Sequence, residues 1–150
     1  MRIAVGSDER THLTDVVIEE LKKHGHTLLL FGPLNENDSD TDWPLTSSKT
    51  AQAVASGQAD EGIVFCWTGT GASIAANKVA GIRAALCHDA ETARGARIWN
   101  HANVLALSLR ATSEAVAKEI LEAWFATPYS EDAWNRQQME RLQQLEQHRT

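Results

Sequence analysis

The densest chemical signal in the sequence is the run 66–73 (CWTGTGAS). A predicted strand ends at Cys66, a turn of glycine and threonine follows, and a helix is predicted from Ser73. Backbone N–H groups in such a turn, together with the N-terminus of a helix, can hold an anion or a developing oxyanion. The same field favours a thiolate, so Cys66 could act as a base or a nucleophile. The competing interpretation is a small buried cysteine at a strand end.

Spacing excludes several better-known motifs at this turn. A cysteine-phosphatase loop needs arginine where Ala72 stands, and the dinucleotide fingerprint needs glycine where Ile74 stands. A thioredoxin-type site needs a second cysteine at the position of Gly69. The triplet of a Walker loop does not occur, and the pair His24 and His26 lacks further metal ligands. We therefore expect neither a metal nor another cofactor.

Short apolar runs alternate with helix-patterned runs along the chain. Strands are predicted at 2–6, 27–31, 62–66, 83–87 and 103–107. Helices are predicted at about 13–24, 44–57, 73–79, 91–99, 113–125 and 130–149. This alternation predicts right-handed βαβ units and a parallel sheet covered by helices on both faces.

Ligands of open parallel sheets bind beyond the carboxyl ends of the strands. The residues predicted to follow those ends are Ser7–Asp8, Cys66–Thr68, His88–Asp89 and Ser108–Arg110. A carboxylate, a thiol, a histidine and an arginine are thus expected to meet at one edge of the sheet.

Length and charge limit the class of protein. The chain has 150 residues, and 14 basic against 20 acidic residues give a net charge of −6. This balance argues against a nucleic-acid or anionic-membrane partner. Two cysteines are too few for a disulfide scaffold. The sequence also contains no signal-peptide core and no apolar run of the ~20 residues that a membrane span needs. We therefore expect a single cytoplasmic domain over 1–150. The chain also contains five tryptophans.

Several of these runs together resemble the ribose-5-phosphate isomerase B and galactose-6-phosphate isomerase family. They are Cys66–Gly71, Ser73–Lys78, Gly81–Asp89, Asn100–Leu107 and Gly6–Asp8. The resemblance covers essentially the whole chain. It implies a Rossmann-like three-layer α/β/α sandwich with a five-stranded parallel sheet and an additional C-terminal helix, 130–150, whose one apolar stripe allows packing back over the domain or, as we expect, on a partner subunit. It also implies a homodimer or tetramer with the site shared between subunits.

The family interconverts aldoses and ketoses of small sugars or sugar phosphates through an enediolate, without metal or nucleotide. By position, Cys66 matches the catalytic base and Thr68 the hydroxyl that helps to move protons. The turn that holds the negative charge corresponds to Gly69, Thr70 and Gly71.

Other family positions contact the sugar. Asp8 and Asn100 match residues that hold sugar hydroxyls, and Arg110 matches an arginine at the dimeric site. Asp42 and Trp43 stand where the family has aspartate and tyrosine, so Trp43 could stack on the substrate.

The phosphate-binding positions depart from the family. Glu9 replaces a histidine, and its carboxylate would repel a phosphate unless it points away or pairs with Arg10. Two arginines of the C-terminal helix are replaced by Trp134 and Gln138. Candidate substitutes for them lie out of that register: Arg136 and Arg141.

The ring-opening position departs as well. Trp99 replaces the family's histidine, so His101, His12 or Asp8 would have to transfer that proton, and Trp67 replaces a glycine beside the base. We therefore expect an isomerase with altered substrate choice, for a substrate of the pentose 5-phosphate type, an open-chain four-carbon sugar, its phosphate or a non-phosphorylated sugar. The alternatives are a non-catalytic or heteromeric carbohydrate-binding subunit of the family and a flavodoxin-like binder of a nucleotide or flavin.

Overall fold

Strands and helices alternate through residues 1–148, the part of the chain that the computed structural model describes. The strands are β1 (Arg2–Ser7), β2 (Thr27–Phe31), β3 (Glu61–Cys66), β4 (Ala84–Leu86) and β5 (Val104–Ser108). The helices are α1 (His12–Lys23), α2 (Trp43–Ala55), α3 (Thr70–Asn77), α4 (Ala90–Asn100), α5 (Glu114–Ala126) and α6 (Ala133–Gln147), with a 3₁₀ turn, η1, at Gly32–Leu34.

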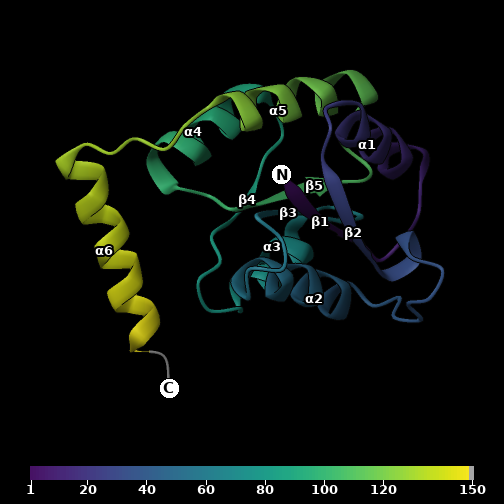
Figure 1. Ribbon diagram of the computed structural model, residues 1–150, viewed down its shortest axis with the longest axis horizontal. Coiled ribbons are helices and arrows are strands. Elements are labelled where there is room, and N and C mark those ends of the chain that lie inside the picture. Colours follow the sequence, from purple (N-terminus) through teal and green to yellow (C-terminus); the bar gives the residue numbers. More distant parts are fainter. Residues whose placement is uncertain (149–150) are drawn as a thin grey trace.

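The strands form one parallel sheet in the order β2-β1-β3-β5-β4. Helices α1, α4 and α5 cover one face, and α2 and α3 cover the other (Figure 1). Strand β3 lies in the middle and is buried along its whole length, as expected for a strand covered on both faces. The predicted three-layer sandwich with a five-stranded parallel sheet and an extra C-terminal helix is confirmed.

The ends of two helices differ from the prediction for local reasons. Helix α3 begins at Thr70 rather than Ser73, because the backbone of Gly69 turns directly into it. Helix α6 begins at Ala133 rather than Ser130, because the Asp132 side chain accepts a hydrogen bond from the Asn135 N–H and caps the helix. Helix α6 ends at Gln147 with His148 as its cap, and the predicted end at Arg149 lies outside the described residues.

Helix α6 stands away from the sandwich at the end of an extended connection (Figure 1). Near its end, Glu146 Oε1 accepts a hydrogen bond of 2.9 Å from the Gly81 N–H. Its apolar side chains Trp134, Leu142 and Leu145 are all exposed. Over residues 1–148, no helix has both the length and the apolar character that crossing a bilayer requires.

A buried ion pair fastens the amino end of β3 to α4. Arg97 lies 2.8 Å from Glu61 through its Nη2, and both side chains are about 10% exposed. The Trp124 indole N–H donates to the second Glu61 oxygen at 2.7 Å, and Arg97 Nη1 donates to the Ala102 carbonyl at 2.7 Å and to the Tyr129 hydroxyl at 3.1 Å. Burial raises the pKa of Glu61 despite the guanidinium beside it. Removing either partner would therefore leave an unpaired buried charge and destabilise the folded protein.

Replacing Arg97 with methionine is expected to lower the free energy of unfolding by about 3–5 kcal/mol at pH 7, because it leaves a buried carboxylate unpaired. Arg97 lowers the pKa of Glu61 against the effect of burial, so its removal should raise that pKa further. The loss should therefore shrink as the pH falls toward 5, because protonation removes the unpaired charge. Urea unfolding at the two pH values measures both effects. The control is Arg94→Met on the same helix, which breaks an exposed pair with Glu91 and should cost less than about 0.5 kcal/mol.

Candidate functional site

The Cys66 thiol lies at the carboxyl end of the central strand, directly beside the start of α3. Its side chain is buried, and its sulfur accepts a hydrogen bond of 3.4 Å from the Ala72 N–H. The first intrahelical bond of α3 runs from the Ser73 N–H to the Gly69 carbonyl, so earlier N–H groups of this helix have no intrahelical acceptor. One of these donors, the Ala72 N–H, already bonds to the sulfur.

Gly69 produces the turn between the thiol and the helix. Its φ of +78° is in the left-handed region, and a Cβ there would lie 3.0 Å from the carbonyl carbon of Leu107 and the amide nitrogen of Ser108. Both the conformation and the space therefore require glycine. On the solvent side, the Thr68 and Thr70 hydroxyl oxygens are 2.7 Å apart and share a hydrogen bond. The predicted oxyanion turn is thus lined by two hydroxyls and a helix N-terminus.

The Trp43 indole covers this turn. A Cβ on Gly71 would lie 3.0–3.2 Å from three ring atoms of Trp43, so the ring is in contact with the backbone of α3. Asp42 precedes α2, and its carbonyl accepts from the Thr46 N–H at 3.0 Å. The Trp43 side chain remains 42% exposed, so one part of its surface is open to a ligand.

Asp8 follows β1 at the same edge of the sheet. Burial raises the pKa of its carboxyl, and the neighbouring Glu9 charge adds to the increase. Among the described residues, its buried Oδ1 has no hydrogen-bond partner. The possibility that Arg10 neutralises Glu9 is wrong for this chain, because Arg10 Nε pairs with Asp15 at 2.9 Å instead. An unpartnered carboxylate oxygen beside Cys66 suits a ligand hydroxyl.

Trp67 follows the end of β3 directly, and Arg110 lies two residues after the end of β5. The Trp67 side chain is 58% exposed, and its carbonyl accepts from the Arg110 N–H at 3.0 Å. Arg110 is exposed. The residues that follow β5 therefore lie at the same edge of the sheet as those that follow β3, as predicted.

Trp99, Asn100 and His101 lie at the opposite edge of the sheet. They lie at the end of α4, just before the amino end of β5. Cys66 pairs with the last of the five residues of β5, so about 13 Å of strand separates the two levels. The His101 ring stacks on Tyr129 at 4.5 Å, and its Nε2 donates to the Ser130 carbonyl at 2.8 Å. In one chain, these residues cannot serve the same substrate atom as the thiol.

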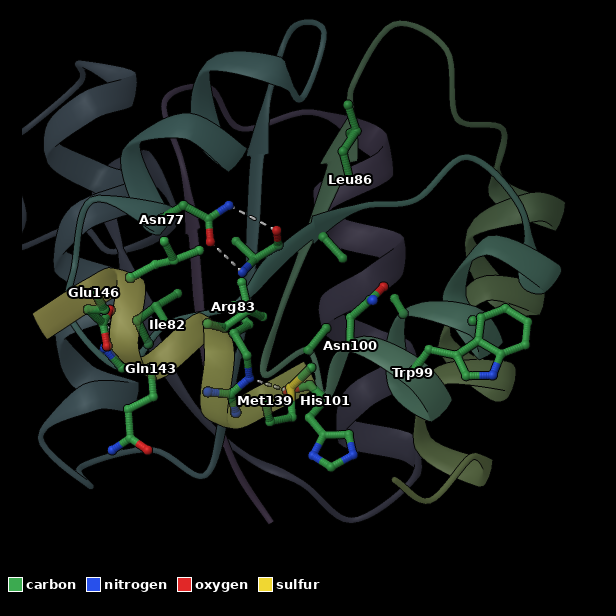
Figure 2. Close-up of a pocket in the computed structure, with 18 of the residues that line it drawn as sticks. Asn77, Ile82, Arg83, Leu86, Trp99, Asn100, His101, Met139, Gln143 and Glu146 are labelled. Atoms are coloured by element: carbon green, nitrogen blue, oxygen red, sulfur yellow. Dashed lines mark hydrogen bonds between the residues drawn. The ribbon is translucent and has the colours of Figure 1, made fainter. Parts of the chain in front are cut away.

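A second group of predicted residues meets at this opposite edge. A hollow of about 600 Å³ between α4 and α6 is lined by Trp99, Asn100, Trp134 and Arg141. It adjoins a groove of about 1110 Å³ between the edge strand β4 and α6, whose lining includes Asn100, His101 and Met139 (Figure 2). These two hollows form the second half of the candidate site.

Two other candidates are engaged elsewhere. Arg136 pairs with Glu131, its Nε 2.6 Å from that residue's carbonyl oxygen. His12 lies 3.3 Å from Glu114 on α5.

Sequence reasoning missed Tyr129 and Ser130, which hold His101, because a contact across 28 or 29 positions leaves no local spacing signal.

The fold and the site together define the class: a parallel α/β sandwich with a thiol at a strand end beside a helix-starting oxyanion turn. Among residues 1–148, no group of three or more histidine, cysteine, aspartate or glutamate side chains is placed to hold a metal ion. The family described as "Ribose/Galactose Isomerase" matches residues 3–145.

Individual relatives agree with this match. Ribose-5-phosphate isomerase B of Escherichia coli is 44% identical over 73% of this chain and 72% of its own length. D-erythrulose-4-phosphate isomerase of Pectobacterium atrosepticum is 39% identical over 83% of this chain and 82% of its own length. The structure of Clostridium thermocellum ribose-5-phosphate isomerase B is 36% identical and superposes over 98% of both chains with a TM-score of 0.89. The chain therefore belongs to the ribose/galactose isomerase family.

Gly69→Ala is expected to destabilise the protein by clearly more than Gly57→Ala. Both glycines have a φ of +78°, which costs alanine about 1–2 kcal/mol. Only Gly69 also meets backbone atoms, whereas a Cβ on Gly57 has nothing within 4 Å. Urea unfolding of the two variants measures the difference, and equal losses would contradict the close packing of the turn.

Proposed function

We propose that this protein is an aldose–ketose isomerase for a small sugar phosphate with Cys66 as the base. The observation that carries the proposal is the position of the Cys66 sulfur, at the carboxyl end of β3 and 3.4 Å from the first-turn N–H of Ala72. A group that exchanges a proton therefore stands beside donors that favour an adjacent oxyanion.

The reaction follows from this arrangement. The thiolate removes the proton from C2 of the aldose, and the electron pair moves through the new C1–C2 double bond to the C1 oxygen. The Thr68 hydroxyl, linked to Thr70, passes the hydroxyl proton between the two oxygens of the enediolate. The Cys66 thiol then returns its proton to C1, which gives the ketose and regenerates the thiolate. The turn at Gly69–Gly71 holds the negative charge.

A four-carbon substrate fits the residues best. A tetrose 4-phosphate cannot close a furanose ring, because its O4 is esterified, and it needs no ring-opening acid. Trp99 stands at the position of the family's ring-opening histidine, and tryptophan transfers no proton. The Pectobacterium relative, named for erythrulose 4-phosphate, supports the same assignment. A phosphorylated substrate is retained in the cytoplasm, and we place the reaction there.

A second copy of the chain completes the site in this proposal. Cys66 and Asp8 lie at one edge of the sheet, whereas Asn100 and Arg141 line the hollow near the other edge. In a symmetric dimer or tetramer, the second half of one subunit faces the first half of another. Helix α6, with its exposed apolar side chains, is the segment that we expect to pack on the partner.

The first test is a panel of ribose 5-phosphate, erythrose 4-phosphate and the two unphosphorylated sugars. Turnover of erythrose 4-phosphate is expected to exceed that of ribose 5-phosphate, and Cys66→Ser should lower kcat by roughly 10²–10⁴-fold by removing the base. Cys87→Ser is the control, because burial raises the pKa of that thiol to about 12 and keeps it protonated. Efficient ribose 5-phosphate turnover would contradict the altered specificity.

The shared site is tested by mixing two inactive variants, Cys66→Ala and Asn100→Ala, after joint refolding. Half of randomly assembled dimers are then hybrids, and each hybrid carries one intact site, so about a quarter of the unmodified activity should return. A site contained in one subunit would give no recovery.

The competing function is a non-catalytic carbohydrate-binding or heteromeric subunit of the family. Its expected behaviour is sugar binding with no turnover in the unmodified protein and equal affinity in Cys66→Ala. Calorimetric titration beside the turnover assay separates the two functions.

A further inference from the structure

A lysine on α2 holds together the loop that precedes the Trp43 indole. Lys49 Nζ lies 2.9 Å from Asp38 Oδ1 and also contacts the Asp40 carboxylate. Helix α2 begins at Trp43, so Lys49 lies on the helix that this loop leads into. The chain between η1 and α2 forms the blue loop at the right of Figure 1. The lysine thus bridges two carboxylates of one loop from the following helix.

Asp38 carries this bridge on to the carboxyl edge of the sheet. Its Oδ2 accepts from the Gly32 N–H at 2.8 Å, and its Oδ1 accepts from the Asp40 N–H at 3.0 Å. These donors and the Lys49 ammonium hold the pKa of Asp38 down to about 2. The side chain is only 11% exposed. Asp38 therefore stays charged at any pH suitable for assay. It connects Gly32 and Asp40 of the loop with Lys49 of the following helix.

Gly32 places the loop against the end of β1. Its φ is +68°, and a Cβ there would lie 2.4 Å from the Ser7 carbonyl oxygen and 3.3 Å from that of Asp40. Ser7 is the last residue of β1 and directly precedes Asp8. The bridged loop therefore starts beside Asp8 and ends at Trp43, the ring that covers Gly71.

We propose that Lys49 is a positioning residue for the isomerase site: by bridging Asp38 and Asp40 it holds the 32–42 loop so that Trp43 stays over the oxyanion turn. The inference rests on the proposed function and on the expectation from the family positions that Trp43 stacks on the substrate. Lys49 does not itself reach the substrate in this account, because its ammonium is neutralised by two carboxylates. Its effect on the reaction passes through Trp43.

The test compares Lys49→Met with Lys49→Arg, which keeps the charge, and with Lys118→Met, which breaks a lysine–carboxylate pair on α5 outside the site. Lys49→Met should raise KM for erythrose 4-phosphate about three- to tenfold and change kcat by less than about twofold, because it loosens a binding contact. Lys49→Arg should restore most of the affinity, and Lys118→Met should leave KM unchanged.

A double-mutant cycle identifies the route of the effect. In a Trp43→Ala background, Lys49→Met should add little to KM, because residues that act through one contact are not additive. Amide hydrogen exchange should increase over 32–46 in Lys49→Met alone. An unchanged KM, unchanged exchange or full additivity with Trp43→Ala would overturn the proposal. Asp40→Asn, which keeps the Lys49–Asp38 pair, should show smaller changes in the same direction and replaces Lys49→Met if that variant does not fold.

The outcomes separate this inference from the proposed function. If the unmodified protein turns over none of the sugars, the proposed isomerase function fails, and the exchange over 32–46 decides by itself whether Lys49 holds the loop. If turnover is present and only the Lys49 effects are missing, the positioning role alone fails.

Discussion

The common direction of the strands is the constraint on which the rest of this structure depends. In a parallel sheet every strand ends at one edge, and every connecting helix returns the chain to the other. Asp8, Cys66 and Ser108 therefore meet although they are far apart in sequence, because each follows or ends a strand. The same rule sends the end of α4, with Asn100, to the opposite edge. The two groups of candidate residues are separated by the direction of the chain itself, which is why a second copy enters the proposed function.

Close packing around two glycines shapes the carboxyl edge of the sheet. Gly69 turns the chain from β3 into α3 against the backbone of β5, and Gly71 leaves room for the Trp43 ring. At the other end of β3, the Glu61–Arg97 pair fixes α4 and, through Tyr129, the connection toward α6. The central strand thus carries the thiol at one end and the anchor of the second half-site at the other. Both halves are held by contacts to the same strand.

The five tryptophans divide by position. Trp124 is fully buried and donates to Glu61, so it belongs to the core. Trp43 and Trp67 stand at the thiol edge, and Trp99 and Trp134 line the second hollow, all substantially exposed. By the family positions, we expect Trp99 to replace a histidine, Trp134 an arginine and Trp67 a glycine, whereas Trp43 stands where the family has tyrosine. These large, uncharged surfaces are one reason why we propose a shorter, open-chain substrate.

The sequence by itself determined the alternation of strands and helices, the parallel sheet, the thiol beside a glycine turn and the family, because these depend on local periodicity and on contiguous motifs. It placed the ends of α3 and α6 less well, since the Gly69 turn and the Asp132 cap act through single backbone bonds. Only the tertiary structure decided that Arg10 pairs with Asp15 and that His101 is held by Tyr129. These contacts join residues by packing in three dimensions, and no spacing along the chain encodes them.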